Sequence, residues 1–112
     1  MQIRSYARLN RYHVSTLAYF AEKLKATPDG DGTLLDHSLI LYGSNMGNSN
    51  QHQHFDVPHI LVGGASGALK GGRHLAHPRK SVMTGNLLLS VLDLFGIHQD
   101  RQGDSTGRLE NL

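Results

Sequence analysis

Apolar residues in the first quarter of the chain recur at the spacing of a helix. Val14, Leu17 and Ala21 follow one another at intervals of three and four residues, so a helix places them on one face. This pattern predicts an amphipathic helix from about residue 9 to residue 26. The segment 27–33 ends it, because its proline and two glycines do not continue a helix and favour a tight turn.

Two short apolar runs follow, and neither alternates with polar residues. Residues 38–42 and 58–62 each contain at least three consecutive apolar side chains. Continuous runs are typical of strands in parallel sheets, which are covered on both faces. We therefore predict two buried parallel strands. Residues 69–75 indicate a further short hairpin or edge strand around two adjacent glycines.

The last periodic segment predicts a second helix that begins at residue 82 or 84 and ends at Phe95. Gly96 is suited to the position that follows a helix. The segment from 99 to 112 is polar, and we expect it to lie on the surface. The buried stripe of the helix is expected to comprise Leu87, Leu88, Val91, Leu92 and Phe95.

The predicted order is therefore α-β-β-α, which defines an α/β segment with a core from about residue 9 to residue 98. Two strands alone do not form a stable parallel sheet, since both faces need cover and both edges need neighbours. We therefore expect residues 1–112 to be one segment of a larger, mostly parallel sheet that is incomplete in this chain. The remaining strands would come from another chain or from a missing N-terminal part of the same domain.

Charge and composition exclude several function classes. The net charge is only +2 and the basic residues are scattered, which argues against nucleic-acid binding. One small basic cluster could meet an anion, although a solvated loop rim is the favoured interpretation. The chain has no cysteine, no apolar run long enough to span a membrane, and no apolar segment of a signal peptide near Met1. The basic cluster comprises Lys70, Arg73, Arg79 and Lys80.

The loop between the two predicted strands contains the strongest candidates for chemistry, His52 and His54. In an extended backbone, residues two apart point the same way, so both imidazoles could face one ion such as zinc. The spacing by itself is a weak signal, since paired histidines in loops are more often exposed or hydrogen-bonded. A complete site needs further ligands, and the candidates are Asp56, His74 and His77.

Ser44, Asn45 and Asn48 lie earlier in the same loop, just past the first strand. They could contact a substrate or orient a metal ligand. The alternative is that they only shape the loop, as such residues commonly do. No Gly-x-Ser-x-Gly elbow surrounds Ser44, which argues against a nucleophilic serine.

Several blocks of the sequence, taken in order, resemble one known family. The chain resembles the C-terminal portion of the HXXSHH-motif family, a domain of unknown function in exported bacterial proteins, over residues from about 9 to 112. The blocks that carry the resemblance are Gly30-Asp31-Gly32-Thr33-Leu34-Leu35-Asp36, Leu41-Tyr42-Gly43-Ser44, His52-Gln53-His54, Pro58-His59-Ile60-Leu61-Val62-Gly63-Gly64, Lys70-Gly71-Gly72-Arg73-His74, Asn86-Leu87-Leu88-Leu89 and Gly103-Asp104-Ser105-Thr106-Gly107.

The resemblance implies a longer parent protein. Members of the family commonly begin with an export signal of twin-arginine type, which implies a periplasmic or extracellular location for the parent. Their namesake His-x-x-Ser-His-His motif is expected just before the first helix, and this sequence does not contain it. The family is also distantly similar to the alkaline phosphatase and sulfatase superfamily, in which an Asp-His pair after a central strand binds metal. His52 lies where that histidine would fall, and it is preceded by Gln51 instead of Asp.

The resulting hypothesis is a segment whose parent is a metal-dependent hydrolase of phosphate or sulfate esters. His52 and His54 would bind a divalent ion, zinc or manganese, while Ser44, Asn45 and Asn48 would contact the substrate or orient the ligands. The catalytic residues are not assigned, because the nucleophile of the superfamily would lie in the missing N-terminal region. The alternative is a non-catalytic exported binding or surface protein of the same fold.

Overall fold

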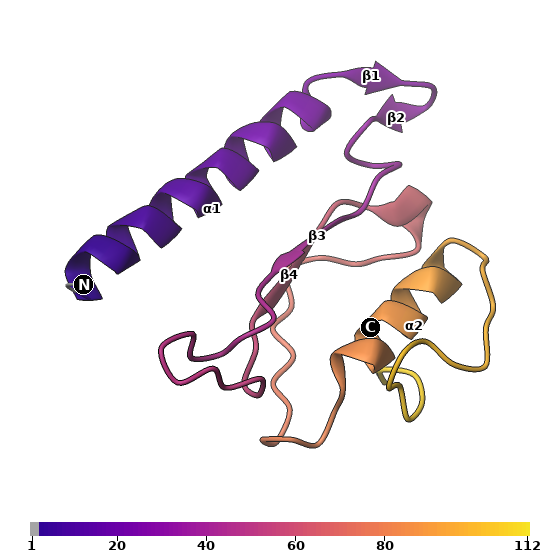
Figure 1. Ribbon diagram of the computed structural model, residues 1–112. Coiled ribbons are helices and arrows are strands. Elements are labelled where there is room, and N and C mark those ends of the chain that lie inside the picture. The colour runs from indigo at the N-terminus through magenta and orange to yellow at the C-terminus, as the bar shows by residue number, and fades with distance from the viewer. Residues whose placement is uncertain (1–2) are drawn as a thin grey trace.

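The computed structural model describes residues 3–112 and combines two helices with two small sheets. Both predicted helices are confirmed, although the first begins well before the predicted residue 9 (Figure 1). In chain order the elements are α1 (Ile3–Lys25), β1 (Pro28–Asp29), β2 (Gly32–Thr33), β3 (Ile40–Gly43), β4 (His59–Val62), the 3-10 helix η1 (Ala65–Gly67) and α2 (Thr84–Leu94).

The prediction of a parallel sheet is wrong, because β3 and β4 pair antiparallel. Ile40 lies opposite Val62, and Gly43 lies opposite His59. The 15 residues from 44 to 58 form an irregular loop, not the helical crossover by which parallel strands are usually joined. The strands are also only partly covered, since Leu41 at 37% and Ile60 at 42% remain exposed. The two apolar runs therefore form strands of an antiparallel pair that is only partly covered, and not buried strands of a parallel sheet.

The tight turn expected after the first helix is present as the β1–β2 hairpin. Pro28 pairs with Thr33 in an antiparallel register, and Gly30 takes a left-handed φ of 58° at the tip. The Asp36 carboxylate accepts hydrogen bonds from the backbone N–H and the hydroxyl of Thr33, both at 2.8 Å. His37 also holds the hairpin, because its ring contacts the carboxylates of Asp29 and Asp31. These local contacts explain why the segment turns at this point.

No strand forms at residues 69–75 within the described part of the chain, so the predicted edge strand is wrong. The left-handed φ of Gly72, 74°, is not that of an extended strand. The Arg73 side chain instead donates to two backbone carbonyls, those of Lys70 at 3.0 Å and Asn111 at 2.8 Å. The glycines of this segment therefore belong to a loop that reaches the end of the chain.

The polar tail lies on the surface as expected, since most of its residues are exposed, and it also docks along α2. The side-chain amide of Asn86 exchanges hydrogen bonds with Thr106, at 3.1 Å to its hydroxyl and 2.9 Å from its backbone N–H. One turn further on, the Ser90 hydroxyl accepts from the backbone N–H of Leu109 at 2.7 Å. Ser105 is only 9% exposed as a result. The tail is held against the helix mainly by these hydrogen bonds, because α2 offers matching donors and acceptors.

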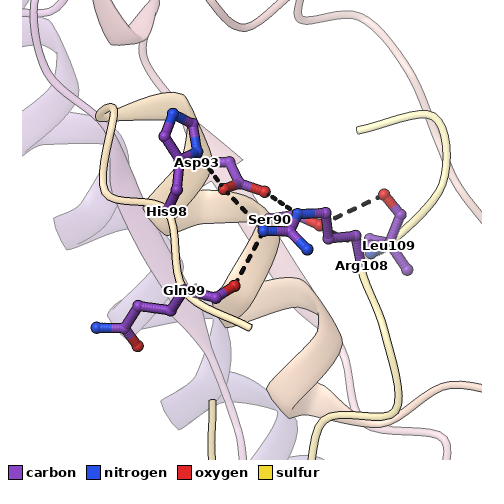
Figure 2. A network of polar contacts seen from close by, with 6 residues as sticks. All are labelled: Ser90, Asp93, His98, Gln99, Arg108 and Leu109. Carbon is purple, nitrogen blue, oxygen red and sulfur yellow. Dashed lines mark hydrogen bonds and ion pairs between the residues drawn. The ribbon is translucent and has the colours of Figure 1, made fainter. Parts of the chain in front are cut away.

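An ionic network holds the last part of this contact (Figure 2). Arg108 donates to the Asp93 carboxylate on α2 and, at 3.0 Å, to the carbonyl of Gln99. The His98 ring lies 2.8 Å from the same carboxylate. The hydrogen bond from Arg108 is the main reason why the pKa of Asp93 lies below its usual value.

The buried core of the described residues is small. Only Ala65, Leu87 and Leu89 are buried apolar side chains, and α1 has no buried residue. The accessible surface is 8436 Å², whereas a compact chain of this mass would expose about 6100 Å². The radius of gyration is 15.7 Å, compared with about 13 Å for a compact domain of this length. Within residues 3–112, many large apolar side chains therefore remain exposed.

None of the helices within residues 3–112 has the length and hydrophobicity required to cross a membrane.

Candidate functional site

A broad open cleft of about 1180 Å³ lies against the β3–β4 pair. The loop after β3 forms part of its wall, and the segment between η1 and α2 forms another part. Three of the five predicted site residues line this cleft, namely Ser44, Asn45 and His54. His52 and Asn48 do not. The structure therefore brings only part of the predicted set to one place.

His54 is the best-placed candidate ligand in the loop. Its Nδ1 lies 3.2 Å from the backbone carbonyl oxygen of Asn45, and the side chain faces the cleft. The tautomer with the proton on Nδ1 satisfies this contact, because a carbonyl oxygen can only accept. Nε2 then holds the free lone pair that a metal ion requires, which is the usual arrangement for a ligating histidine.

His52 does not share this geometry. Its backbone is left-handed, with φ of 53°, and its N–H donates to the carbonyl of Ser49 at 3.4 Å within a turn. The extended backbone that would align His52 with His54 is therefore not present at this point. Within residues 3–112, no three His, Asp or Glu side chains are grouped closely enough to hold an ion. The metal site remains a prediction.

The hydroxyl of Ser44 and the amide of Asn48 shape the loop. Ser44 Oγ accepts from the backbone N–H of Met46 at 3.1 Å and donates to its carbonyl at 2.9 Å. Asn48 Oδ1 accepts from the backbone N–H groups of Asn50 at 3.1 Å and Gln51 at 3.2 Å. Both side chains therefore make the local contacts expected of loop-forming residues. Asn45 acts on the site through its backbone carbonyl, which orients His54.

The basic cluster lies in the same cleft, which was not predictable from the spacing of its residues. All four basic side chains line the cleft together with His54. Arg79 pairs with Asp56 at 2.6 Å, and its guanidinium stands 4.7 Å from the centre of the Phe55 ring. The Lys80 ammonium stands 4.6 Å from the same ring. Arg79 is 65% exposed, which agrees with the interpretation as a solvated loop rim. The part played by Phe55 was not predictable, because these contacts join residues more than twenty positions apart.

His59 is a second cleft residue that the sequence did not single out. It opens β4 opposite Gly43, and any side chain at Gly43 would collide with its ring. Its Nε2 lies 3.4 Å from the Thr84 hydroxyl at the start of α2. Partial burial lowers the pKa of His59, which favours the neutral imidazole near pH 7. A glycine opposite a histidine on paired strands is a signal that becomes visible only once the register is known.

The other candidate ligands from the sequence also reach this cleft. Asp56, His74 and His77 line it together with His54, although they are not gathered around one point. Asp56 is engaged by Arg79. The cleft therefore combines imidazoles, cationic side chains and loop polar groups, a combination suited to an anionic ligand.

Comparison of the chain with protein families, with curated proteins and with solved structures finds no match.

Proposed function

We propose that this chain is the C-terminal segment of a longer HXXSHH-type protein. The full-length protein would be a metal-dependent hydrolase of phosphate or sulfate esters. The parent would be exported to the periplasm or the cell exterior. One observation carries the proposal. A single cleft contains an oriented imidazole, that of His54, together with four cationic side chains, which suits a metal ion and an anionic ester side by side.

The donor set of the loop fits a zinc or manganese ion in part. His54 presents Nε2 once its Nδ1 donates to the Asn45 carbonyl, and His52 is an exposed imidazole in the same loop. A bound divalent ion would polarise the ester oxygen and stabilise the charge that develops on it. In this proposal Asn45 orients His54, while Ser44 and Asn48 hold the loop in shape around it.

The remaining ligands and strands would come from the missing N-terminal part of the domain. The small core, the two unpaired outer edges of the β3–β4 sheet and the exposed α1 support this part of the proposal. A two-stranded sheet with partly exposed faces gains stability when further strands extend it.

Metal content tests the proposal directly. The protein expressed from its whole gene would be loaded with zinc or manganese, desalted and measured by elemental analysis. We expect about one tightly bound ion per chain, lost in His54→Ala and reduced in His52→Ala. His13→Ala is the matched control, because His13 is exposed on α1 and does not line the cleft. No bound metal, or equal loss in the control, would contradict the proposal.

A non-catalytic binding or surface protein of the same fold is the second candidate. The exposed apolar face of α1 also fits this candidate, since Tyr6 is 42% exposed, Leu9 52% and Phe20 50%. Large exposed apolar patches commonly mark interaction sites. In this case the protein would bind a partner through α1 and hold no stoichiometric metal, so the metal measurement also separates the two candidates.

A further inference from the structure

Two loops that are far apart in the sequence meet on one wall of the cleft. Asp56 and Arg79 form an ion pair at 2.6 Å, and the Phe55 ring supports Arg79 at 4.7 Å and Lys80 at 4.6 Å. We call these four residues, Phe55, Asp56, Arg79 and Lys80, the cationic wall. All four line the cleft that His54 also faces.

The backbone of the cationic wall adopts an uncommon conformation at two positions. Asp56 has φ of 56° and Lys80 has φ of 60°, both in the left-handed region that non-glycine residues rarely occupy. Such conformations cost free energy and persist where the surroundings hold them, often at binding sites. Asp56 directly follows Phe55, and Lys80 directly follows Arg79. The strained backbone positions are therefore next to the residues that make the aromatic and ionic contacts.

The charges of the cationic wall are not balanced within the described residues. Two adjacent cations share one aromatic ring, and Asp56 pairs with Arg79 alone. Across residues 3–112, no carboxylate lies within ion-pair distance of Lys80 or Lys70. Like charges held this close repel each other, and a bound anion would remove that repulsion.

We propose that the cationic wall binds the tetrahedral oxyanion of the ester, a phosphate or sulfate group, with Lys80 as its principal contact. Arg79 adds planar donors that its pair with Asp56 does not use, and Lys70 on the same cleft adds a further positive charge. The inference rests on the proposed function and names the residues that would bind the anionic group of its substrate. The concave cleft suits a small organic ester better than a flat polymer surface.

Anion binding without metal tests the inference. The whole protein, stripped of metal by a chelator, would be titrated with inorganic phosphate and with sulfate while backbone amide shifts are followed by NMR. We expect binding to weaken about tenfold in Lys80→Gln, as for the loss of one charge-assisted contact. Phe55→Leu should also weaken it, because the platform is lost while the charge remains.

Lys23→Gln is the matched control, since the Lys23 ammonium also stands over an aromatic ring, that of Tyr19 at 5.1 Å, but lies on α1 outside the cleft. Phosphate binding that is absent in the wild type, or weakened equally in the control, would overturn the inference. Tight binding of a mixed-sequence DNA oligonucleotide with no response to phosphate or sulfate would overturn it in favour of a nucleic-acid surface.

The two proposals fail separately. Metal binding without anion binding would contradict the cationic wall and leave the metal site standing. Anion binding that survives in a protein without any metal affinity would support the cationic wall and contradict the metal-dependent hydrolase. A dispersed amide spectrum for each variant confirms that it is folded.

Discussion

At the scale of single residues, Gly85 fixes how closely the tail approaches α2. A side chain at this position would lie 2.7 Å from the carbonyl oxygen of Gln102 and 2.8 Å from the backbone nitrogen of Ser105. Both contacts are with backbone, which cannot rotate away as a side chain can. The absence of a Cβ is therefore what lets the tail pack against the first turn of the helix.

Gly85→Ala should loosen the tail. We expect a destabilisation of about 1–3 kcal/mol, the usual cost of overpacking a close contact, despite the better helix propensity of alanine. Faster hydrogen exchange at the amides of Ser105 and Thr106, together with a lower midpoint of urea unfolding, would show it. Gly107→Ala is the control, because nothing lies within 4 Å of its added Cβ. Equal effects of the two substitutions would contradict this account.

The roles predicted for the five site residues stay predictions, and the structure shows only which of them lie at the cleft. Ser44, Asn45 and His54 share one loop, and all three do reach the cleft. His52 does not line the cleft, and its backbone is left-handed. The spacing of two histidines does not predict such a backbone conformation. The aromatic platform at Phe55 was missed, since its partners lie on a distant loop that only the fold brings near.

At the scale of elements, the β1–β2 hairpin carries a charge contact that depends on pH. His37 Nδ1 lies 2.8 Å from Asp29, and its Nε2 lies 3.0 Å from Asp31. The hydrogen bond with Asp29 is the main cause of a raised pKa for His37. Since the pKa is raised, this contact stabilises the hairpin fully below the ordinary histidine pKa, and the stabilisation is lost as pH rises through the folded value.

Asp29→Asn should lower the pKa of His37 towards its ordinary value. The Cε1 proton of the ring, followed by NMR from pH 5 to pH 9, reports the titration. Asp100→Asn is the control, because Asp100 lies in the tail and is not among the partners of His37. An unchanged His37 titration in Asp29→Asn would show that the carboxylate does not hold the imidazolium.

Elements set by local sequence were predictable, and elements set by pairing were not. The periodicity of the helices and the proline and glycines of the turn act within a few residues, so α1, α2 and a tight turn after α1 were expected, whereas the two short strands of the hairpin were not. The direction of β3 against β4 depends on the path of the loop 44–58, which has no sequence period. The docking of the tail on α2 depends on the pairing of Asn86 with Thr106, twenty positions apart.

At the scale of the whole molecule, the chain leaves more surface exposed than its mass requires. The excess over a compact chain is about 2300 Å², as large as the surface buried in many permanent interfaces. The number of strands predicted that the chain is one segment of a larger sheet, and this stays a prediction, whereas the predicted strand direction was wrong. A two-stranded sheet beside a cleft with cationic and imidazole side chains is the basis for proposing that the chain forms part of the site of a larger enzyme.

Hydrolysis by the complete protein tests the central claim most directly. The protein expressed from its whole gene, loaded with zinc or manganese, would be assayed for release of inorganic phosphate or sulfate from aryl esters. The account predicts metal-dependent release from one of the two ester classes, reduced at least a hundredfold in His54→Ala and unchanged in His13→Ala. Hydrolysis of neither ester class with either metal, or activity that survives intact in His54→Ala, would contradict it.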